Sequence, residues 1–405
     1  MSEPTSPGIF RSGMTRRDFL RSATLAAIAA PAASALAACG VKGKPEAKPT
    51  VLGLTQLPPA AKQLSIANWE EYIDPKVWRR YARNTGVAVS YREVIPDNET
   101  FFGTIQPLLA AEKPIGYDII VVSDWLIGKM ARLGYLLPLH HDLLPNFTAH
   151  AGAVYKDPDY DPGSKFSIPW QAGITGLAYN QKLVKRPITR FQDLFDPALK
   201  EKVGMMTEMR DTVNMTLLSI GVTDLQKATM ADAERAVAKL KELRDIGVVR
   251  DYYEDGYVDA LARGDLAVSL AWSGDVLQLT LDNPDIKFVV PEEGGILWVD
   301  SMCIPRKAEH PTDAHAWMNY VYDPRVAATI AEFVNFVTPV PATKQIILQD
   351  AAALSGEDRA YLQGVATSEL VFPSSASEGR LHNYKLLPEA EEKVWNEMFQ
   401  EVSEG

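Results

Sequence analysis

The sequence is poor in cysteine and in positive charge. Only Cys39 and Cys303 occur among 405 residues, which excludes a fold held by several disulfides and a paired-cysteine zinc site. Lys and Arg number 41 against 52 Asp and Glu, so the formal net charge is −11 at pH 7. A surface that binds nucleic acid is basic, so this balance argues against a nucleic-acid partner.

Catalytic and cofactor motifs are also missing. The chain has no glycine-rich phosphate loop and no serine in a nucleophile elbow. Residues 157–163 begin like a calcium loop, but Pro162 and Ile168 stand where that loop needs Gly and Glu, so we predict a solvated turn. Residues 140–142 read His-His-Asp, and adjacent side chains seldom converge on one metal, so a surface turn is predicted there. We therefore expect that the protein binds no metal or cofactor and is not an enzyme.

The N-terminal segment has the layout of an export signal. Arg16-Arg17 and the following Phe-Leu precede a charge-free, alanine-rich run at 22–38, which is shorter than the roughly 20 apolar residues of a spanning helix. The twin arginines resemble a Tat signal, and Leu-Ala-Ala-Cys-Gly at 36–40 resembles a lipobox. We expect residues 1–38 to be removed, Cys39 to be lipidated, and 39–63 to tether the protein to the outer face of the cell membrane.

The remaining 367 residues carry a net charge near −13, because the first 38 contain four arginines and two acids. Their length favours two lobes over one core. Short apolar strands alternate with helical patterns. The predicted strands are 64–67, 87–91, 117–122, 176–179 and 267–272, and the predicted helices include 75–85, 100–112, 125–133, 229–246 and 312–334, the last broken by Pro324. This alternation predicts α/β lobes, in which ligands bind beyond the carboxyl ends of the strands. Cys303 lies in an apolar stretch, where a buried, unreactive thiol is expected.

Five segments resemble the spermidine/putrescine-binding proteins of bacterial polyamine importers. They are Asn-Trp-Glu-Glu-Tyr-Ile at 68–73, Tyr-Asp-Ile-Ile-Val-Val-Ser at 117–123, Phe-Ser-Ile-Pro-Trp at 166–170, Phe-Gln-Asp-Leu-Phe-Asp-Pro at 191–197 and Pro-Glu-Glu-Gly-Gly-Ile-Leu-Trp-Val-Asp-Ser at 291–301. The resemblance runs in the same order from about 64 to 345. It implies a two-lobed α/β fold of the type II periplasmic-binding class, with a ligand cleft between the lobes and crossovers near 176, 300 and 341. Lobe 1 would comprise 64–175 plus 300–340, and lobe 2 would comprise 176–299 plus 341–405.

The resemblance also implies a function and a site. The protein would be the monomeric substrate-binding lipoprotein of an ABC importer, closing on putrescine or spermidine and delivering it to the membrane permease. The family's ligand-binding positions fall here on Trp69, Tyr72, Ser123, Trp125, Glu208, Asp211, Trp272, Trp298, Asp300 and Phe336. Aromatic faces suit methylenes and cations, and carboxylates suit ammonium groups.

Local spacing supports part of this set. Trp298 and Asp300 are two apart in an extended stretch, so they share a face. Glu208 and Asp211 are three apart at a predicted helix start, where they share a face but would also simply compensate the helix dipole. For each tryptophan the competing interpretation is core packing.

Departures from the family pattern leave the ligand open. Phe336 and Trp125 stand where the family has tyrosines, and Asp124 would add a charge if it faced the cleft. The alternatives are the same fold binding another amine, an amino acid or a phosphonate, and an exported amine-processing enzyme. An anionic ligand would need an arginine in the cleft, and helical spacing predicts that Arg210 points away from the acids beside it.

Overall fold

The computed structural model describes residues 56–254 and 256–404, so the predicted signal, Cys39 and residues 40–55 lie outside the described residues. Near the start of the described chain, Thr312 donates a hydrogen bond to the Pro58 carbonyl, and the Ala61 amide donates to Asp313 at 2.8 Å. Among the described helices, none is both long and apolar enough to cross a membrane.

Ten strands form one mixed sheet in the order β2-β1-β3-β9-β4-β7-β5-β6, with β8 paired to β4 and β10 to β9. The strands are β1 (Gln63–Asn68), β2 (Ala88–Glu93), β3 (Ile119–Ser123), β4 (Ser167–Asn180), β5 (Val203–Met206), β6 (Val249–Tyr253), β7 (Val268–Trp272), β8 (Ile286–Val289), β9 (Gly295–Cys303) and β10 (Leu381–His382). The predicted strand at 176–179 is thus only the end of a 14-residue strand.

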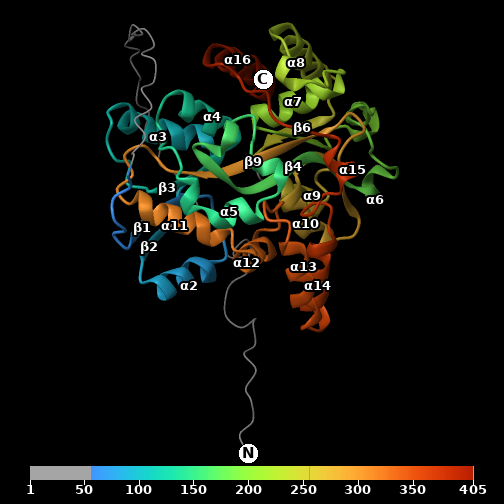
Figure 1. The fold of residues 1–405 in the computed structure, drawn as a ribbon. Coiled ribbons are helices and arrows are strands. Elements are labelled where there is room, and N and C mark those ends of the chain that lie inside the picture. The colour runs from blue at the N-terminus through green and yellow to red at the C-terminus, as the bar shows by residue number, and fades with distance from the viewer. Residues whose placement is uncertain (1–55, 255, 405) are drawn as a thin grey trace, which may run out of the picture. The chain divides into compact units, whose positions relative to one another are not determined.

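The described helices flank this sheet (Figure 1). They are α2 (Pro75–Thr85), α3 (Asn98–Ala110), α4 (Asp124–Arg132), α5 (Pro145–His150), α6 (Gln181–Val184), α7 (Met209–Ser219), α8 (Met230–Asp245), α9 (Tyr257–Arg263), α10 (Ser273–Asp282), α11 (Pro311–Val321), α12 (Pro324–Val334), α13 (Thr343–Ala352), α14 (Gly356–Thr367), α15 (Ser375–Glu378) and α16 (Glu389–Ser403). The predicted break at Pro324 is confirmed, because α11 ends before it and α12 begins with it.

Helix ends follow the capping chemistry of the sequence. The Asp74 carboxylate accepts a hydrogen bond from the Lys76 amide at 2.8 Å, Pro75 opens α2, and Gly86 ends it in the left-handed conformation at φ +73°. Thr229 and Asp232 exchange hydrogen bonds at the start of α8 as a capping box. Pro107 lies inside α3 rather than ending it.

Within the sheet, β9 and β4 lie between two groups of parallel strands. Strands β1, β2 and β3 form one group, and β5, β6 and β7 form the other. Each contact from β3 to β9, from β9 to β4 and from β4 to β7 is antiparallel, so the two groups run in opposite directions. Their carboxyl ends therefore point toward the middle of β4 and β9.

The register shows how close these ends come. Ser123 ends β3 opposite Asp300, which lies opposite Gln171, while Trp272 ends β7 opposite Thr175. Residues 171 and 175 are four apart in β4, roughly 13 Å at the usual rise of a strand. The crossovers predicted near 176 and 300 lie in β4 and β9, the strands that both groups share. The lobe boundaries themselves stay predictions.

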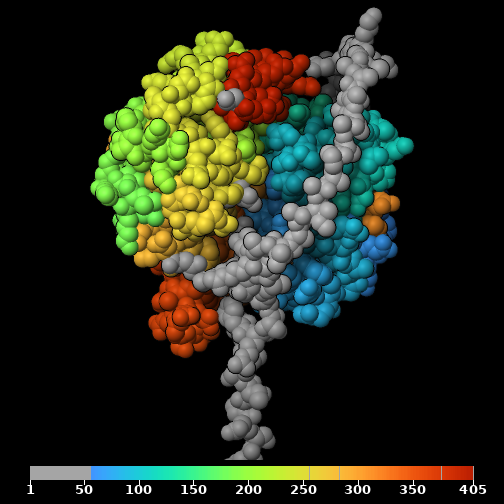
Figure 2. Space-filling model, turned by 180° about the vertical axis from the view of Figure 1, so that it is seen from behind, coloured from blue at the N-terminus to red at the C-terminus, as the bar shows by residue number. Residues whose placement is uncertain are grey.

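The C-terminal part of the chain lies at both ends of the described unit. Helix α13 packs on α12 and α14, whereas α16 packs on α8 and α7. Figure 2 shows α16 in red beside the yellow surface of α8, with orange-red helices at the lower end. The segment between them pairs with β9 through β10. Cys303 is free and buried in β9, as predicted.

Candidate functional site

A group of polar and aromatic side chains lies where the carboxyl ends of the two strand groups meet. Trp298 and Asp300 project from one face of β9, because they are two apart in a strand. Directly opposite on β4 are Gly173 and Gln171. The predicted pairing of an aromatic face with a carboxylate is therefore present in the structure.

Asp300 is held by two hydroxyl groups. Ser123 Oγ donates to Asp300 Oδ1 at 2.7 Å, and the Tyr72 hydroxyl donates to Oδ2 at 2.9 Å. The Asn98 amide fixes Ser123 in turn, donating to its Oγ at 2.9 Å. Only 6% of Asp300 is exposed, and burial raises the pKa of its carboxyl to about 6. The group is therefore ionised above this pH, and neither Lys nor Arg of the described chain pairs with it.

Asp211 forms a second buried carboxylate at the other strand group. It lies in the first turn of α7 and is 0% exposed. It accepts hydrogen bonds from Thr175 Oγ1 at 2.5 Å, from the Tyr384 hydroxyl at 2.7 Å and from Trp272 Nε1 at 2.9 Å. Burial raises the pKa of this carboxyl, although the three donors act in the opposite direction. Its direct partners are neutral, so it could accept a cation.

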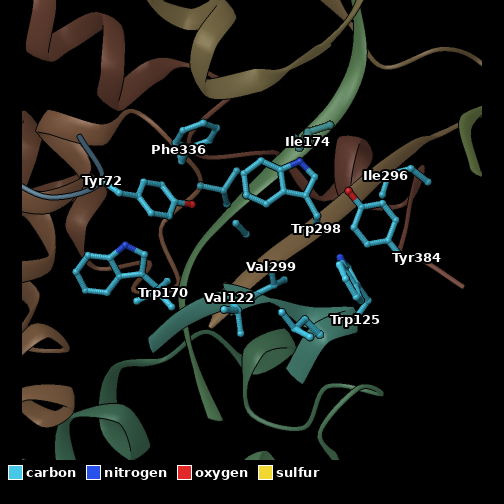
Figure 3. Close-up of a cluster of buried hydrophobic side chains, with 14 of the residues drawn as sticks. Tyr72, Val122, Trp125, Trp170, Ile174, Ile296, Trp298, Val299, Phe336 and Tyr384 are labelled. Atoms are coloured by element: carbon cyan, nitrogen blue, oxygen red, sulfur yellow. The ribbon is translucent and has the colours of Figure 1, made fainter. Parts of the chain in front are cut away.

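Aromatic rings connect the two carboxylates. The Trp298 ring lies edge-to-face with Trp272 at 6.3 Å and with Phe336 at 5.4 Å, and Phe336 contacts Tyr72 at 5.8 Å. Figure 3 shows Tyr72, Phe336 and Trp298 in sequence across the strands. Trp298 Nε1 is buried without a hydrogen-bond partner among the described residues.

A glycine makes room for Trp298. A Cβ built on Gly173 would lie 2.1 Å from Trp298 Cζ2, closer than atoms can approach. The glycine therefore lets the indole lie directly against β4. Trp69, which follows β1, is half-buried and donates from its indole nitrogen to the Val121 carbonyl at 3.0 Å, which fixes its ring beside β3.

Arg210 links Glu208 and Trp125 into a separate group. Its guanidinium lies 3.4 Å from the centre of the Trp125 ring and forms ion pairs with Glu392 at 2.6 Å, Glu99 at 3.0 Å and Glu208 at 3.6 Å. The prediction that Arg210 turns away from the neighbouring acids is therefore wrong for Glu208. Helical spacing describes the helix surface, but this long side chain, only 2% exposed, folds back across the helix start.

Glu208 has a structural role in addition to its charge. It caps α7 by accepting a hydrogen bond from the Arg210 amide at 3.1 Å. Burial and the nearby Glu99 raise the pKa of its carboxyl to about 8. Of the ten predicted site residues, the structure thus joins Tyr72, Ser123 and Asp300 in one hydrogen-bonded group, Asp211 and Trp272 in another, and Trp125 with Glu208 in a third.

The sequence did not reveal several residues at the site. Tyr384 contacts Asp211 from 173 positions away, and Thr175 contacts it from 36 positions away. Gln171 is buried opposite Asp300, and its Oε1 has no hydrogen-bond partner among the described residues. No local pattern marks these side chains, because their neighbours come from remote segments.

Asp124 does not lie on the face of Asp300. It lines a cavity of about 250 Å³ together with Leu297 and Val299 of β9. These two residues alternate with Trp298 and Asp300 and therefore project from the opposite face of the strand. Asp124 is 2% exposed, and burial raises the pKa of its carboxyl to about 8.

The chain is similar to known solute-binding proteins over most of its length. The family model described as "Bacterial extracellular solute-binding protein" matches residues 116–360. Spermidine/putrescine-binding periplasmic protein 1 of Haemophilus influenzae is 29% identical over 281 residues, covering 67% of this chain and 74% of its own. The putrescine-binding periplasmic protein PotF of Escherichia coli is 26% identical over 303 residues, covering 71% and 80%. The solved substrate-binding protein PotD of a spermidine/putrescine ABC transporter from Streptococcus pneumoniae superposes with a TM-score of 0.70 at 25% identity, covering 84% of this chain and 98% of its own.

Proposed function

This chain belongs to the family of bacterial extracellular solute-binding proteins, and from that premise we propose that it captures a polyamine between its lobes for an ABC importer. The predicted fold is confirmed: it is an α/β, two-lobed fold of the type II periplasmic-binding class. The relatives named for spermidine and putrescine support the choice of ligand. No bond is made or broken in this function, which rests on binding and lobe closure.

One observation carries the proposal. Within the described part of the chain, two buried carboxylates, Asp300 and Asp211, are each bonded directly only by neutral donors, and aromatic rings connect them. A polyamine carries ammonium groups on a chain of methylenes. Its ammonium groups would donate charge-assisted hydrogen bonds to the carboxylates, and its methylenes would lie on the rings of Trp298 and Trp272. A cation over such a ring gains roughly 0.5–2 kcal/mol.

The site gives little support to an anionic ligand. A free amino acid or a phosphonate needs a cation opposite its acid group. Arg210 is the guanidinium at this site, and three carboxylates already engage it. An amine without an acid group therefore fits the charges better. The exported-enzyme alternative would be supported by any product formed when the protein is incubated with spermidine.

Export and anchoring complete the proposal. The protein would leave the cytoplasm by the Tat route and carry a lipid on Cys39, so that its tether holds it near the permease at high effective concentration. The periplasmic location in the names of its relatives supports the extracytoplasmic side. Incorporation of labelled palmitate into the wild-type protein but not into Cys39→Ala would support the anchor.

Thermal unfolding with a ligand panel tests the function. The panel contains putrescine, cadaverine, spermidine, spermine, betaine and common amino acids, with 1,4-butanediol as an uncharged control for putrescine. A ligand at one hundred times its dissociation constant adds about 2.7 kcal/mol of stability. We expect one or two polyamines to raise the unfolding temperature and butanediol to leave it unchanged. A rise with an amino acid or betaine, and none with polyamines, would overturn the proposed ligand.

A further inference from the structure

The cavity of about 250 Å³ on the far face of β9 has a strongly acidic lining. Asp157, Asp159 and Glu378 are exposed around it, and Asp124 is buried within it. Among the residues that the structure describes, no Lys, Arg or His lines the cavity. Three exposed carboxylates and one buried carboxyl, with no cation among the described lining residues, indicate a preference for positively charged ligands.

Tyrosines and aliphatic side chains form the remaining walls. The Tyr160 hydroxyl is bonded to Ser301 Oγ at 3.0 Å, and the Tyr384 hydroxyl to Asp211 at 2.7 Å. Tyr155 also lines the cavity and is only 8% exposed, yet its hydroxyl has no hydrogen-bond partner among the described residues. The hydroxyl oxygen is not among the fully buried polar atoms without a partner, so it keeps some exposed surface and can bond to a molecule in the cavity. This hydroxyl is therefore a second sign, besides the charge, that the cavity receives a ligand.

We propose that this cavity is a second binding site, specific for a short aliphatic ammonium compound, on the opposite face of β9 from Asp300 and next to the first site at Tyr384. The carboxylates would accept hydrogen bonds from the ammonium, Tyr155 would bond to a polar end of the ligand, and Leu297, Val299 and the tyrosine rings would contact its methylenes. A volume of about 250 Å³ compares with about 30 Å³ per water molecule in the liquid, so a short diamine fits.

A metal ion suits the cavity less well. In the described chain, no group of three or more His, Cys, Asp or Glu side chains converges as metal ligands do. The carboxylates are instead spread around the cavity, as an extended organic cation requires. A ligand here and a ligand at Asp300 would lie on opposite faces of β9, so both could be present at once.

The buried carboxyl gives the second site its own signature. Asp124 is surrounded by the charged or titratable side chains of Asp300, Arg210, Tyr160 and Tyr384. Burial raises its pKa to about 8, so it carries a proton at neutral pH in the empty cavity. A bound cation favours the ionised form and lowers this pKa. Binding at the second site should therefore release a proton at pH 7. The carboxyl of Asp300, with a pKa of about 6, is mostly ionised already, but burial also raises the pKa of Asp211, so loss of the release in Asp124→Asn, and not the release alone, identifies the second site.

Titration calorimetry with putrescine in two buffers of different ionisation enthalpy tests the proposal. We expect the wild-type protein to bind two equivalents, one of them with proton release. Two exposed substitutions made together, Asp159→Asn and Glu378→Gln, should weaken the proton-linked equivalent at least tenfold, and Asp124→Asn should abolish its proton release. The charge-matched control, Asp142→Asn with Glu397→Gln, alters exposed acids that do not line the cavity and should change neither equivalent.

The outcomes separate this proposal from the proposed function. A single equivalent that Asp300→Asn weakens and the cavity variants leave unchanged would overturn the second site and keep the polyamine function. A single proton-linked equivalent that only the cavity variants weaken would keep the second site and overturn the function assigned to Asp300. No heat of binding in the wild-type protein would overturn both.

Discussion

Replacing Asp300 by asparagine removes one negative charge from the site and changes little else. The amide keeps the shape of the carboxyl and one oxygen that can accept from Ser123 or Tyr72, which now donate at 2.7 and 2.9 Å. The substitution should therefore leave the protein folded. Circular dichroism and the unfolding temperature of the unliganded protein check this point.

The loss of affinity can be estimated from the lost charge. A hydrogen bond to a charged group contributes roughly 1.5–3 kcal/mol, against about 1 kcal/mol for a neutral one. Each 1.4 kcal/mol is tenfold in the dissociation constant. Coulomb attraction of about 4 kcal/mol, for two charges 4 Å apart near a protein surface, sets the upper limit before desolvation is subtracted. We expect putrescine to bind about 10-fold to 100-fold more weakly to Asp300→Asn.

The matched control is Asp161→Asn. Asp161 is also buried and also accepts hydrogen bonds, from the amides of Phe166 and Ser167, but it is absent from the groups around Asp300 and Asp211. Its replacement should lower stability and leave affinity unchanged. Calorimetry above pH 7 measures both variants. An affinity of Asp300→Asn within twofold of wild type, in a folded protein, would refute the assignment of this carboxylate to the ligand.

Three further predictions follow from the same contacts. Because the pKa of Asp300 is about 6, its carboxyl gains a proton below that pH, and the affinity for putrescine should fall toward tenfold per pH unit. Calorimetry between pH 5 and 7.5 measures this dependence. An affinity that does not change with pH over this range would contradict the prediction. Gly173→Ala should displace the Trp298 ring, because the new Cβ would lie 2.1 Å from it, and should weaken putrescine binding at least tenfold. Gly103→Ala is the control, because its Cβ meets open space, and it should leave the affinity unchanged. Equal affinities in the two variants would mean that the Trp298 ring is not part of the site. Arg210→Met removes the cation that pairs with Glu208 and leaves the buried Glu392 only its second partner, Lys129, at 3.2 Å. The substitution should cost about 3–5 kcal/mol of unfolding free energy, measured by urea denaturation; a loss below about 1 kcal/mol would mean that these ion pairs contribute little.

Features that depend on residues a few positions apart were predictable from the sequence. The twofold repeat of an extended chain placed Trp298 and Asp300 on one face, and the alternation of strands and helices predicted the α/β lobes. Capping residues located both ends of α2. Each of these features depends on residues a few positions apart, so one sequence suffices to recognise it.

Contacts between remote segments were not predictable in the same way. Tyr384 reaches Asp211, and Arg210 reaches Glu392 across 182 positions, because the segment after β10 passes beside β9 before α16 packs on α7 and α8. For the same reason, the sequence did not show whether the Asp124 side chain faces the cleft. A strand pattern shows which residues share a face, but it does not show what the rest of the chain places opposite them.

A crystal structure of the protein with bound spermidine would show directly whether the polyamine lies between Asp300 and Asp211. We expect a polyamine on the Trp298 face of β9, with ammonium groups within hydrogen-bonding distance of Asp300 and Asp211 and methylenes against Trp298 and Trp272. Density for the polyamine only elsewhere, or a second ligand class occupying these carboxylates while spermidine fails to bind, would contradict it.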